Sequence, residues 1–373
     1  MCGIAGFTGP CDRRTLEQFQ RALYHRGPDQ QGTYCGSEVA LSSNRLAIID
    51  PVGGQQPILN EDRTCVIVFN GEIYNYRELR ADLEKRHCFT TKSDTEVILH
   101  LYEERGPAVS EHLKGDFAFC IWDSRDQSCL LSRDPMGVKP LFYAIAQNGN
   151  LVFSSELSSL LIHPEVPRRL NPAAIEEYLS CLYISAPRSL IAGVHKLAPG
   201  ESLLWKAGTL RTWKYWSLPE VAQPAEALDG FETRVLDRLR TAVRRRLIAD
   251  VPVGAFLSGG LDSSLIVALA REECRDLQTF SIGYHEAAFN ELEFARQVSR
   301  RFGTDHHEFI IRPEAEPLIE QVIAAMDEPI ADSSAIPTFL VARETRRHVK
   351  VALSGVGGDE LFFGYPRHLG AKL

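Results

Sequence analysis

The pattern of hydrophobic and polar positions divides the chain into two regions that meet near residue 228. In the first region, short runs of β-branched, aromatic and aliphatic residues are bounded by glycine, aspartate, asparagine and proline, a pattern typical of strands. These runs predict strands over residues 39–49, 65–69, 117–122 and 128–132, and helical spacing predicts helices over 77–86 and 95–104. Because strands and helices do not alternate regularly, we expect an α+β layered fold here.

The second region follows a different pattern. Hydrophobic residues recur every three or four positions from Leu228 to Leu247, which predicts an amphipathic helix. Beyond it, strands are predicted over 251–257, 278–284, 307–311 and 349–353, separated by helices over 263–272, 291–302, 314–326 and 335–348. This alternation predicts a parallel sheet with helices on its faces. The weakly periodic stretch from Leu218 to Ala227 is the expected domain boundary.

Charge and composition remove several classes of protein. The formal net charge of −8, from 41 basic and 49 acidic residues, argues against a non-specific nucleic-acid binder, which needs an excess of positive charge. No apolar run reaches the roughly 18 residues of a membrane span, and the start of the chain does not resemble a secretory signal. We therefore expect a cytoplasmic protein without nucleic-acid or membrane partners.

The cysteines fit the same compartment. There are nine of them, an odd number, and no two have Cys-x-x-Cys spacing. This argues against a disulfide framework and against a zinc site, and it fits a reducing cytoplasm. Most of these cysteines are expected to be small buried hydrophobic residues, with Cys2 as the exception.

Two glycine-rich loops of the second region carry candidate chemistry. Ser258-Gly259-Gly260-Leu261-Asp262-Ser263-Ser264 joins a predicted strand to a helix, where backbone N–H groups and the helix dipole favour an anion. The loop is not a Walker A motif, and a tight strand–helix turn is the simpler alternative. Ser354-Gly355-Val356-Gly357-Gly358-Asp359-Glu360 also leaves the carboxyl end of a strand. Asp262 and Asp359 would then face one crevice and hold Mg²⁺, unless each only caps a helix.

Cys2 follows the initiator methionine. Removal of Met1 would leave a residue that carries both a thiol and a free α-amino group, and the amine can accept the thiol proton near neutral pH. The nucleophile would then carry its own base. A cysteine at position 2 alone is a weak signal, and an ordinary buried cysteine is the alternative.

Three further segments of the first region carry groups that could bind a substrate of Cys2. Asn70 and Gly71 follow an apolar strand and can donate together to an oxyanion, although Asn-Gly is also a common hairpin turn. Arg45 can bind a carboxylate with two hydrogen bonds. Asp94 can bind an ammonium group or cap the helix that follows it. Each signal alone favours the structural alternative.

Taken together, the segments resemble a known family. Cys2-Gly3-Ile4-Ala5-Gly6, His25-Arg26-Gly27-Pro28-Asp29, Arg45-Leu46-Ala47-Ile48-Ile49-Asp50, Asn70-Gly71-Glu72-Ile73-Tyr74-Asn75 and Ser93-Asp94-Thr95-Glu96 resemble, in this order, the class II glutamine amidotransferase domain. Residues 258–264 and 353–365 resemble the pyrophosphatase-loop domain of the glutamine-hydrolysing asparagine synthetases. The resemblance implies an N-terminal-nucleophile αββα sandwich over residues 2–215. It also implies an α/β parallel-sheet ATP-pyrophosphatase domain over 226–373 that lacks its C-terminal part.

For the first domain, the resemblance implies glutamine hydrolysis. Cys2 would attack the side-chain amide of glutamine and form a glutamyl thioester, while Asn70 and Gly71 hold the oxyanion. The residues implied to bind glutamine are Arg45, Ile48, Ile49, Asn70, Glu72 and Asp94. Ammonia would pass through an internal tunnel to the second site.

For the second domain, the resemblance implies that ATP and aspartate form β-aspartyl-AMP, which ammonia converts to asparagine. The residues implied to bind ATP are Phe256, Ser258, Gly259, Gly260, Asp262, Ser263, Ser264, Ile282, Ser354 and Gly355. Asp262 and Asp359 would carry Mg²⁺. Glutamine, aspartate and ATP are the implied partners, and a homodimer is the assembly considered.

This sequence differs from the family pattern at two points, and each leaves an alternative function open. Val356 stands where the family usually has an acidic residue, so the acceptor carboxylate can differ and a paralogous amidotransferase is the second hypothesis. The chain also ends at Leu373, well before the family's usual end, so a fragment with glutaminase activity alone is a further alternative. A non-catalytic regulatory protein with the same fold is the third class.

Overall fold

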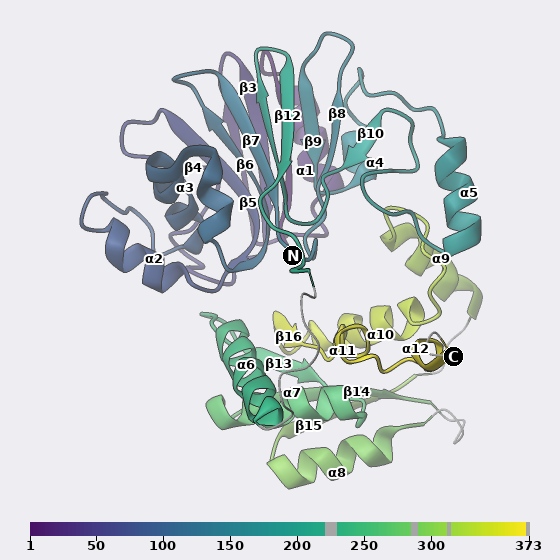
Figure 1. The fold of residues 1–373 in the computed structure, drawn as a ribbon. Helices are drawn as coiled ribbons and strands as arrows, with labels where there is room; N and C mark the ends of the chain where they lie inside the picture. Colours follow the sequence, from purple (N-terminus) through teal and green to yellow (C-terminus); the bar gives the residue numbers. More distant parts are fainter. Residues whose placement is uncertain (221–229, 285–289, 312–314, 371–373) are drawn as a thin grey trace. The chain divides into compact units, whose positions relative to one another are not determined.

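The computed structural model describes residues 1–220, 230–284, 290–311 and 315–370, which form two compact units (Figure 1). The first unit comprises residues 1–221 together with 326–331, and the second comprises the rest of the chain. The start of the second domain at residue 226, the helix start at Leu228 and the helix start at Glu314 lie outside the described residues. None of the helices in the described ranges is long and apolar enough to span a membrane.

The first unit contains two six-stranded sheets, ordered β10-β8-β9-β1-β3-β2 and β12-β11-β7-β6-β5-β4, with antiparallel pairing. Its strands are β1 (Gly3–Thr8), β2 (Gln30–Cys35), β3 (Val39–Arg45), β4 (Ile58–Leu59), β5 (Cys65–Ile73), β6 (Gly115–Asp123), β7 (Ser128–Arg133), β8 (Phe142–Ile145), β9 (Leu151–Ser154), β10 (Val194–Lys196), β11 (Glu201–Lys206) and β12 (Thr209–Lys214). Its helices are α1 (Arg13–Ala22), α2 (Tyr76–Leu83), α3 (Asp94–Arg105), the 3₁₀ helix η1 (Gly106–His112), α4 (Leu157–Leu160) and α5 (Pro172–Cys181).

The two sheets pack face to face around one hydrophobic core. Ile4 and Leu41 from the first sheet meet Val66, Val68 and Cys120 from the second, and all five are buried. A second core lies on the other face of the first sheet, where α1 and α4 cover it. Helix α3 lies beside β5 of the second sheet, and α2 packs against α3 (Figure 1). The predicted αββα sandwich is therefore confirmed.

The second unit is built on a parallel sheet of order β15-β14-β13-β16. Its elements are α6 (Phe231–Arg246), β13 (Val253–Phe256), α7 (Leu261–Glu273), β14 (Gln278–Gly283), α8 (Leu292–Phe302), β15 (Asp305–Ile310), α9 (Ala315–Ala325), α10 (Ala335–Thr345), β16 (Val351–Leu353), α11 (Gly358–Phe362) and α12 (Pro366–Gly370). Side chains of α6, α7 and α8 pack with β13 and β16 in one core. The predicted α/β parallel sheet is confirmed.

The structure changes two local expectations in the first unit. The predicted strand over 65–69 continues to Ile73, so Asn70 and Gly71 lie inside β5 and do not form a hairpin turn. The predicted strand over 39–49 ends at Arg45, because residues 46–50 leave the sheet. Both changes place candidate site residues at the end of the sandwich.

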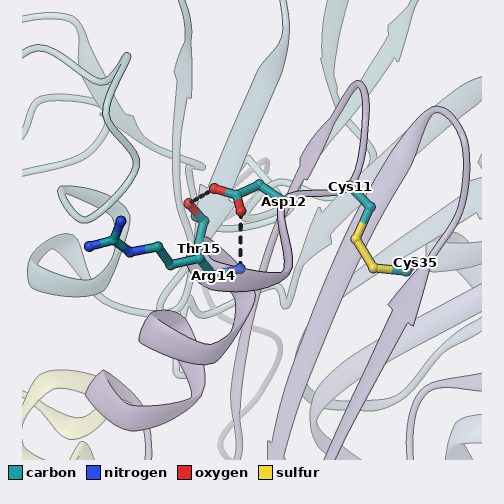
Figure 2. Close-up of a disulfide and its surroundings, with 5 residues drawn as sticks. All are labelled: Cys11, Asp12, Arg14, Thr15 and Cys35. Carbon is teal, nitrogen blue, oxygen red and sulfur yellow. Dashed lines mark hydrogen bonds between the residues drawn. A yellow bond between two sulfur atoms is a disulfide. The ribbon is translucent and has the colours of Figure 1, made fainter.

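The structure also corrects the expectation for the cysteines. Cys11 and Cys35 form a disulfide with their Cα atoms 5.5 Å apart (Figure 2). Beside it, the Asp12 carboxylate accepts hydrogen bonds from the Arg14 N–H and the Thr15 hydroxyl at the start of α1. The count and spacing of cysteines missed this pair, because the chain path brings the end of β1 and the end of β2 together. The other seven cysteines are free.

Candidate functional site

Cys2 lies at the start of β1 and is held by two neighbours. The Leu46 N–H donates to Cys2 Sγ at 3.4 Å, and the thiol donates to the Leu46 carbonyl at 3.7 Å. Arg26 Nε donates to the Cys2 carbonyl at 2.8 Å, while the Arg26 guanidinium pairs with Glu156 at 2.8 Å. The sulfur is therefore fixed in position from both its side chain and its backbone.

Burial decides the protonation of the amino terminus and the thiol. The amino terminus in the structure belongs to Met1, and burial lowers the pKa of the Met1 amine from 8.0 to about 6. Burial raises the pKa of the Cys2 thiol, although the nearby amine opposes this shift. Removal of Met1 would place the terminal amine on Cys2 itself, and a neutral amine on the same residue as a protonated thiol is what a self-activating nucleophile requires.

Asn70 and Glu72 face the same side of β5 as Val66 and Val68, because side chains alternate along a strand. The two valines pack against Ile4 of β1, so the two polar side chains continue that face toward the end where Cys2 lies. Neither the oxygen nor the nitrogen of the Asn70 amide has a hydrogen-bond partner, although Asn70 is 1% exposed. A buried unpaired amide is costly, which indicates that a ligand supplies the missing partners.

Gly71 supplies a second candidate donor. Gly71 lies opposite Phe117 of β6. The Phe117 carbonyl points away from Gly71, because it accepts a hydrogen bond from the Asp134 N–H. The Gly71–Phe117 pair is therefore a non-hydrogen-bonded one, so the Gly71 N–H points away from β6. A Cβ at Gly71 would lie 2.3 Å from the Asp116 carbonyl oxygen, so only glycine fits there.

Arg45 at the end of β3 is a fixed buried cation. Its guanidinium donates to Gln30 Oε1 at 2.8 Å and to the backbone carbonyls of Ile49 and Asp50. A Cβ at Gly54 would lie 2.5 Å from Arg45 Nη2, so glycine is needed beside the guanidinium. These contacts hold the arginine in one orientation, as recognition of a carboxylate requires.

Asp94 and Glu72 form an acidic pair near Arg45. Asp94 Oδ2 accepts from the Ile73 N–H at 2.9 Å, whereas the helix cap is made by Ser93, whose Oγ accepts from the Thr95 N–H. Glu72 Oε2 is buried without a partner. Burial raises the pKa of Asp94 to about 6, and burial together with the Asp94 charge raises that of Glu72 well above its usual value. A bound cation between them would relieve this repulsion.

The remaining predicted residues of the first site, Ile48 and Ile49, follow Arg45 in the chain. Ile48 is half-buried and Ile49 is 4% exposed, in the segment that follows Arg45. This segment is fixed by Asp29, whose Oδ2 accepts from the Ala47 N–H at 2.9 Å. The structure thus brings a thiol, a cation, an acidic pair and unpaired amide groups together.

Sequence reasoning missed the residues that support this pocket. Arg26, Glu156 and Gln30 were not assigned roles, although each holds Cys2 or Arg45 in place. Arg26 and Asp29 belong to the segment His25-Arg26-Gly27-Pro28-Asp29, which resembles the amidotransferase domain, so this motif could have identified them. Glu156 lies 130 positions from Arg26, and nothing in the sequence linked the two.

In the second unit, the loop from Ser258 to Gly260 joins β13 to the N-terminus of α7. Ser258 Oγ and Ser263 Oγ are 3.0 Å apart, and the Gly260 N–H donates to Ser258 Oγ at 3.2 Å. Gly259 has a φ of 85°, and a Cβ there would lie 2.5 Å from the Cβ of Phe294. Ser264 Oγ is buried without a partner. The loop thus tolerates only glycine at position 259, and it carries hydroxyl and backbone N–H groups of the kind that bind anions at a helix N-terminus.

The loop after β16 packs against the first glycine-rich loop. A Cβ at Gly358 would lie 2.4 Å from Asp262 Oδ2, and one at Gly355 would lie 2.9 Å from the Ser263 nitrogen. Asp262 therefore faces the segment that also carries Ser354 and Asp359. The side chain of Val356 is 91% exposed in this loop.

Phe256 and Ile282 complete the second candidate site. Both are half-buried and lie toward the carboxyl ends of the neighbouring strands β13 and β14. Ligands of open α/β sheets bind at this edge. All ten residues predicted to bind ATP thus belong to β13, β14, α7 or the two glycine-rich loops.

Comparison with known proteins adds the family context. A family described as glutamine amidotransferase domain matches residues 1–216, and one described as asparagine synthase matches residues 234–373. The chain is 38% identical over 375 residues to asparagine synthetase [glutamine-hydrolyzing] 1 of Bacillus subtilis, covering 98% of this chain and 59% of that protein. A relative from Methanocaldococcus jannaschii, named putative asparagine synthetase [glutamine-hydrolyzing] 2, is 37% identical over 399 residues, which cover 99% of this chain and 76% of that protein.

Among solved structures, the glutamine phosphoribosylpyrophosphate amidotransferase of B. subtilis matches with a TM-score of 0.45 at 17% identity, covering 86% of this chain and 70% of that chain. The chain spans about three fifths of the length of the B. subtilis asparagine synthetase.

Proposed function

Because this chain belongs to the family of glutamine-hydrolysing asparagine synthetases, we propose that its first unit releases ammonia from glutamine and that its second unit uses ATP to activate aspartate for amidation. The observation that carries the first part is the unpaired, buried amide of Asn70 on the face of β5 that leads to Cys2. The second part rests on the two glycine-rich loops at the carboxyl edge of the parallel sheet.

The first unit would act through covalent catalysis. After Met1 is removed, the Cys2 amine takes the thiol proton while Sγ attacks the side-chain carbonyl carbon of glutamine. Asn70 Nδ2 and the Gly71 N–H would donate to the oxyanion, as donors without other partners are able to do. The protonated amine would return the proton to the leaving nitrogen, so that ammonia departs and a glutamyl thioester remains. Water then hydrolyses the thioester to glutamate and restores the thiol.

The charges of the pocket match a free α-amino acid. Arg45 would bind the α-carboxylate of glutamine, and Asp94 with Glu72 would bind its α-ammonium group. Ile48 and Ile49 would line the pocket. This arrangement selects a substrate with both charges on one carbon, which a peptide-bound glutamine lacks.

In the second unit, the serine hydroxyls and backbone N–H groups of Ser258, Gly259, Gly260, Ser263 and Ser264 would hold the pyrophosphate of ATP. Phe256, Ile282, Ser354 and Gly355 would bind the nucleotide at the same edge. The aspartate β-carboxylate attacks the α-phosphorus, pyrophosphate leaves and β-aspartyl-AMP forms. Ammonia then displaces AMP, giving asparagine.

Asp262 and Asp359 fit a magnesium ion. The Asp262 carboxylate lies against Gly358, which directly precedes Asp359 in the chain, and the Asp359 carboxylate lies against Gly364. Carboxylate oxygens beside a polyphosphate are the ligands that Mg²⁺ prefers. When bound, the ion would neutralise phosphate charge.

The remaining parts of the proposal concern the whole protein. We take residues 2–215 and 226–373 as its glutaminase and synthetase domains, the cytoplasm as its compartment, and a homodimer as its assembly. Glutamine, aspartate and ATP are the proposed partners, without nucleic acid or membrane.

Val356 supports a second candidate, an amidotransferase of the same fold with another acceptor. Its exposed apolar side chain stands in the loop that contacts Asp262. A valine supplies neither charge nor a hydrogen bond to an acceptor or to the nucleotide.

One assay separates these functions. The protein is incubated with ATP, Mg²⁺ and ammonia, with and without aspartate, and pyrophosphate is measured together with glutaminase activity. Aspartate-dependent pyrophosphate release supports the synthetase, and release that is indifferent to aspartate supports another acceptor. Glutaminase activity alone would reduce the function to the first unit, and loss of both activities would contradict the proposal.

A further inference from the structure

Four side chains outside the glutamine pocket converge in the first unit. Glu61 lies in the turn between β4 and β5, His87 in the connection from α2 to α3, and His100 and Glu103 one helical turn apart on α3. One ligand atom from each lies within 4.8 Å of the others. The His87 and His100 rings stack with their centroids 4.7 Å apart.

Four nitrogen–oxygen separations in the cluster, which involve both carboxylate oxygens of Glu61, are close to those between neighbouring ligands of a metal ion. His87 Nδ1 lies 3.6 Å from Glu61 Oε1 and 3.7 Å from Glu103 Oε2. His100 Nδ1 lies 3.6 Å from Glu61 Oε2 and 2.8 Å from Glu103 Oε2. Ligands at 2.0–2.1 Å from a tetrahedral zinc ion are separated by about 3.3 Å, in the middle of this range.

We propose that Glu61, His87, His100 and Glu103 form a binding site for a divalent transition-metal ion, with zinc as the best match. Two imidazoles exclude Ca²⁺ and Mg²⁺ as preferred ions, since these prefer oxygen ligands. Two nitrogen and two oxygen donors in a tetrahedral set suit zinc.

The surroundings orient the donors as metal sites require. His87 Nε2 lies 3.4 Å from Glu104 Oε1, and His100 Nε2 lies 3.7 Å from Glu96 Oε1, so a carboxylate stands behind each ring. A ring that ligates through Nδ1 directs its other N–H toward such a carboxylate. This pattern leaves both Nδ1 atoms directed into the cluster.

The two glutamates are also held from behind. Glu61 Oε1 accepts from the Cys88 N–H at 2.8 Å, and Glu103 Oε1 accepts from Asn60 Nδ2 at 2.7 Å. The side chain of His100 is fully buried, whereas that of Glu61 is 36% exposed. Glu61 therefore marks the side from which an ion enters.

The role of the ion follows from the three segments it would join. It would tie the β4–β5 turn and the α2–α3 connection to α3, whose first residue is Asp94. We therefore assign it a structural role: it would hold the helix that carries a glutamine-binding residue. The cysteine count and spacing argued against a zinc site, but they do not test a site made of histidine and glutamate, and these four ligands are spread from position 61 to 103.

The test uses the full chain, stripped of metal with a chelator, dialysed and titrated with zinc chloride by calorimetry. His87→Gln and Glu61→Gln remove one ligand each while keeping size and hydrogen-bonding capacity. His195→Gln removes a histidine from another part of the same unit, and Cys88→Ser removes the exposed thiol beside His87. Cys2→Ala controls for zinc bound by the reactive thiol.

We expect one zinc ion per chain for the unaltered protein and for the three controls. Zinc affinity should fall by at least about 10-fold in both ligand variants. Zinc should raise the Tm of the unaltered protein and leave that of His87→Gln unchanged. Thermal unfolding without metal identifies a misfolded variant, and Glu61→Gln, on the exposed side, serves if His87→Gln does not fold.

Two results would overturn the proposal. One is the absence of stoichiometric zinc in the unaltered protein, which would make the cluster a hydrogen-bonded ion-pair network only. The other is undiminished affinity in both ligand variants, or its loss in Cys2→Ala or Cys88→Ser, which would place the zinc on a thiol.

Discussion

The proposed glutamine site and the proposed nucleotide-binding loops differ in whether their polar groups already have hydrogen-bond partners within the protein. In the first unit, Asn70 is buried and Glu72 is half-buried, and each has buried side-chain polar atoms without a hydrogen-bond partner. In the second unit, Ser258 is exposed, and its hydroxyl already bonds to Gly260 and lies 3.0 Å from Ser263 Oγ. In the proposed function, a small amino acid would complete the unpaired polar groups of the first site, whereas a polyphosphate would be bound by backbone groups at an open edge.

This contrast predicts where a substitution acts. Changes in the pocket should affect glutamine chemistry through one side chain each. Changes in the loops should act through backbone conformation, and their effect should appear in the ATP-dependent step alone.

The largest effect is expected for Cys2→Ala. Loss of the nucleophile should lower glutamine hydrolysis by about 10⁴-fold or more, because no other group forms the thioester. Ammonia-dependent pyrophosphate release should persist. Glutamate production and pyrophosphate are measured in parallel, with Cys88→Ser as the matched control. Joint loss of both activities in a folded variant would contradict the two-site account.

The second largest effect is expected for Asn70→Ala. Removal of an oxyanion donor lowers kcat by about 10²–10³-fold while KM for glutamine changes little. Asn148→Ala, in an exposed turn, is the control and should have normal kinetics. An unchanged kcat would remove Asn70 from the oxyanion site.

Arg45→Gln should act mainly on binding. Losing a charge-assisted contact to the α-carboxylate is expected to raise KM for glutamine by about 10–100-fold. Steady-state kinetics with glutamine and with a glutamine methyl ester provide the comparison. The variant should lose the preference for the free acid, and a retained preference would argue against the assignment.

Gly259→Ala tests the loops. An alanine at a φ of 85° is strained by about 1–2 kcal/mol and would also meet Phe294, so pyrophosphate release should fall by about tenfold. Glutaminase activity should not change. Gly303→Ala, at a φ of 64° with open space around it, carries the strain without the clash and should keep pyrophosphate release. Equal losses in both variants would point to stability instead of the first glycine-rich loop.

The smallest effect concerns pH. Burial raises the pKa of Asp94 to about 6, and only its ionised form attracts the ammonium group of glutamine. Lowering the pH from 7 to 5.5 protonates Asp94, so glutamine affinity should fall about fourfold. Calorimetry on Cys2→Ala isolates binding from chemistry, and Asp94→Asn in that background should bind weakly with a smaller pH dependence, because only Glu72 remains to titrate beside the ammonium group. A pH-independent affinity with Asp94 intact would refute its role.

Much of the fold followed from local patterns in the sequence. The alternation after residue 228 predicted the parallel sheet, because each strand and helix there has a clear period. β1 and α1 were missed: β1 is buried along its whole length and so lacks alternation, and α1 buries few apolar side chains, among them Leu16 and Phe19.

The candidate site was predictable where one segment carries the signal. Asn70, Gly71 and Glu72 are contiguous, and so are Ser93 and Asp94. The Cys11–Cys35 disulfide, the Arg26–Glu156 pair and the cluster of Glu61, His87, His100 and Glu103 join distant positions. Only the chain path brings these residues together, so periodicity and spacing do not reveal them.

The central claim is that Cys2, freed of Met1, is the nucleophile of a glutamine pocket. The most direct measurement is peptide mass spectrometry of the protein after reaction with an electrophilic glutamine analogue, with and without excess glutamine. The account predicts an amino-terminal peptide that begins at Cys2, carries the adduct on its sulfur and is protected by glutamine. An active glutaminase that retains Met1, or that carries the adduct at another residue, would contradict it.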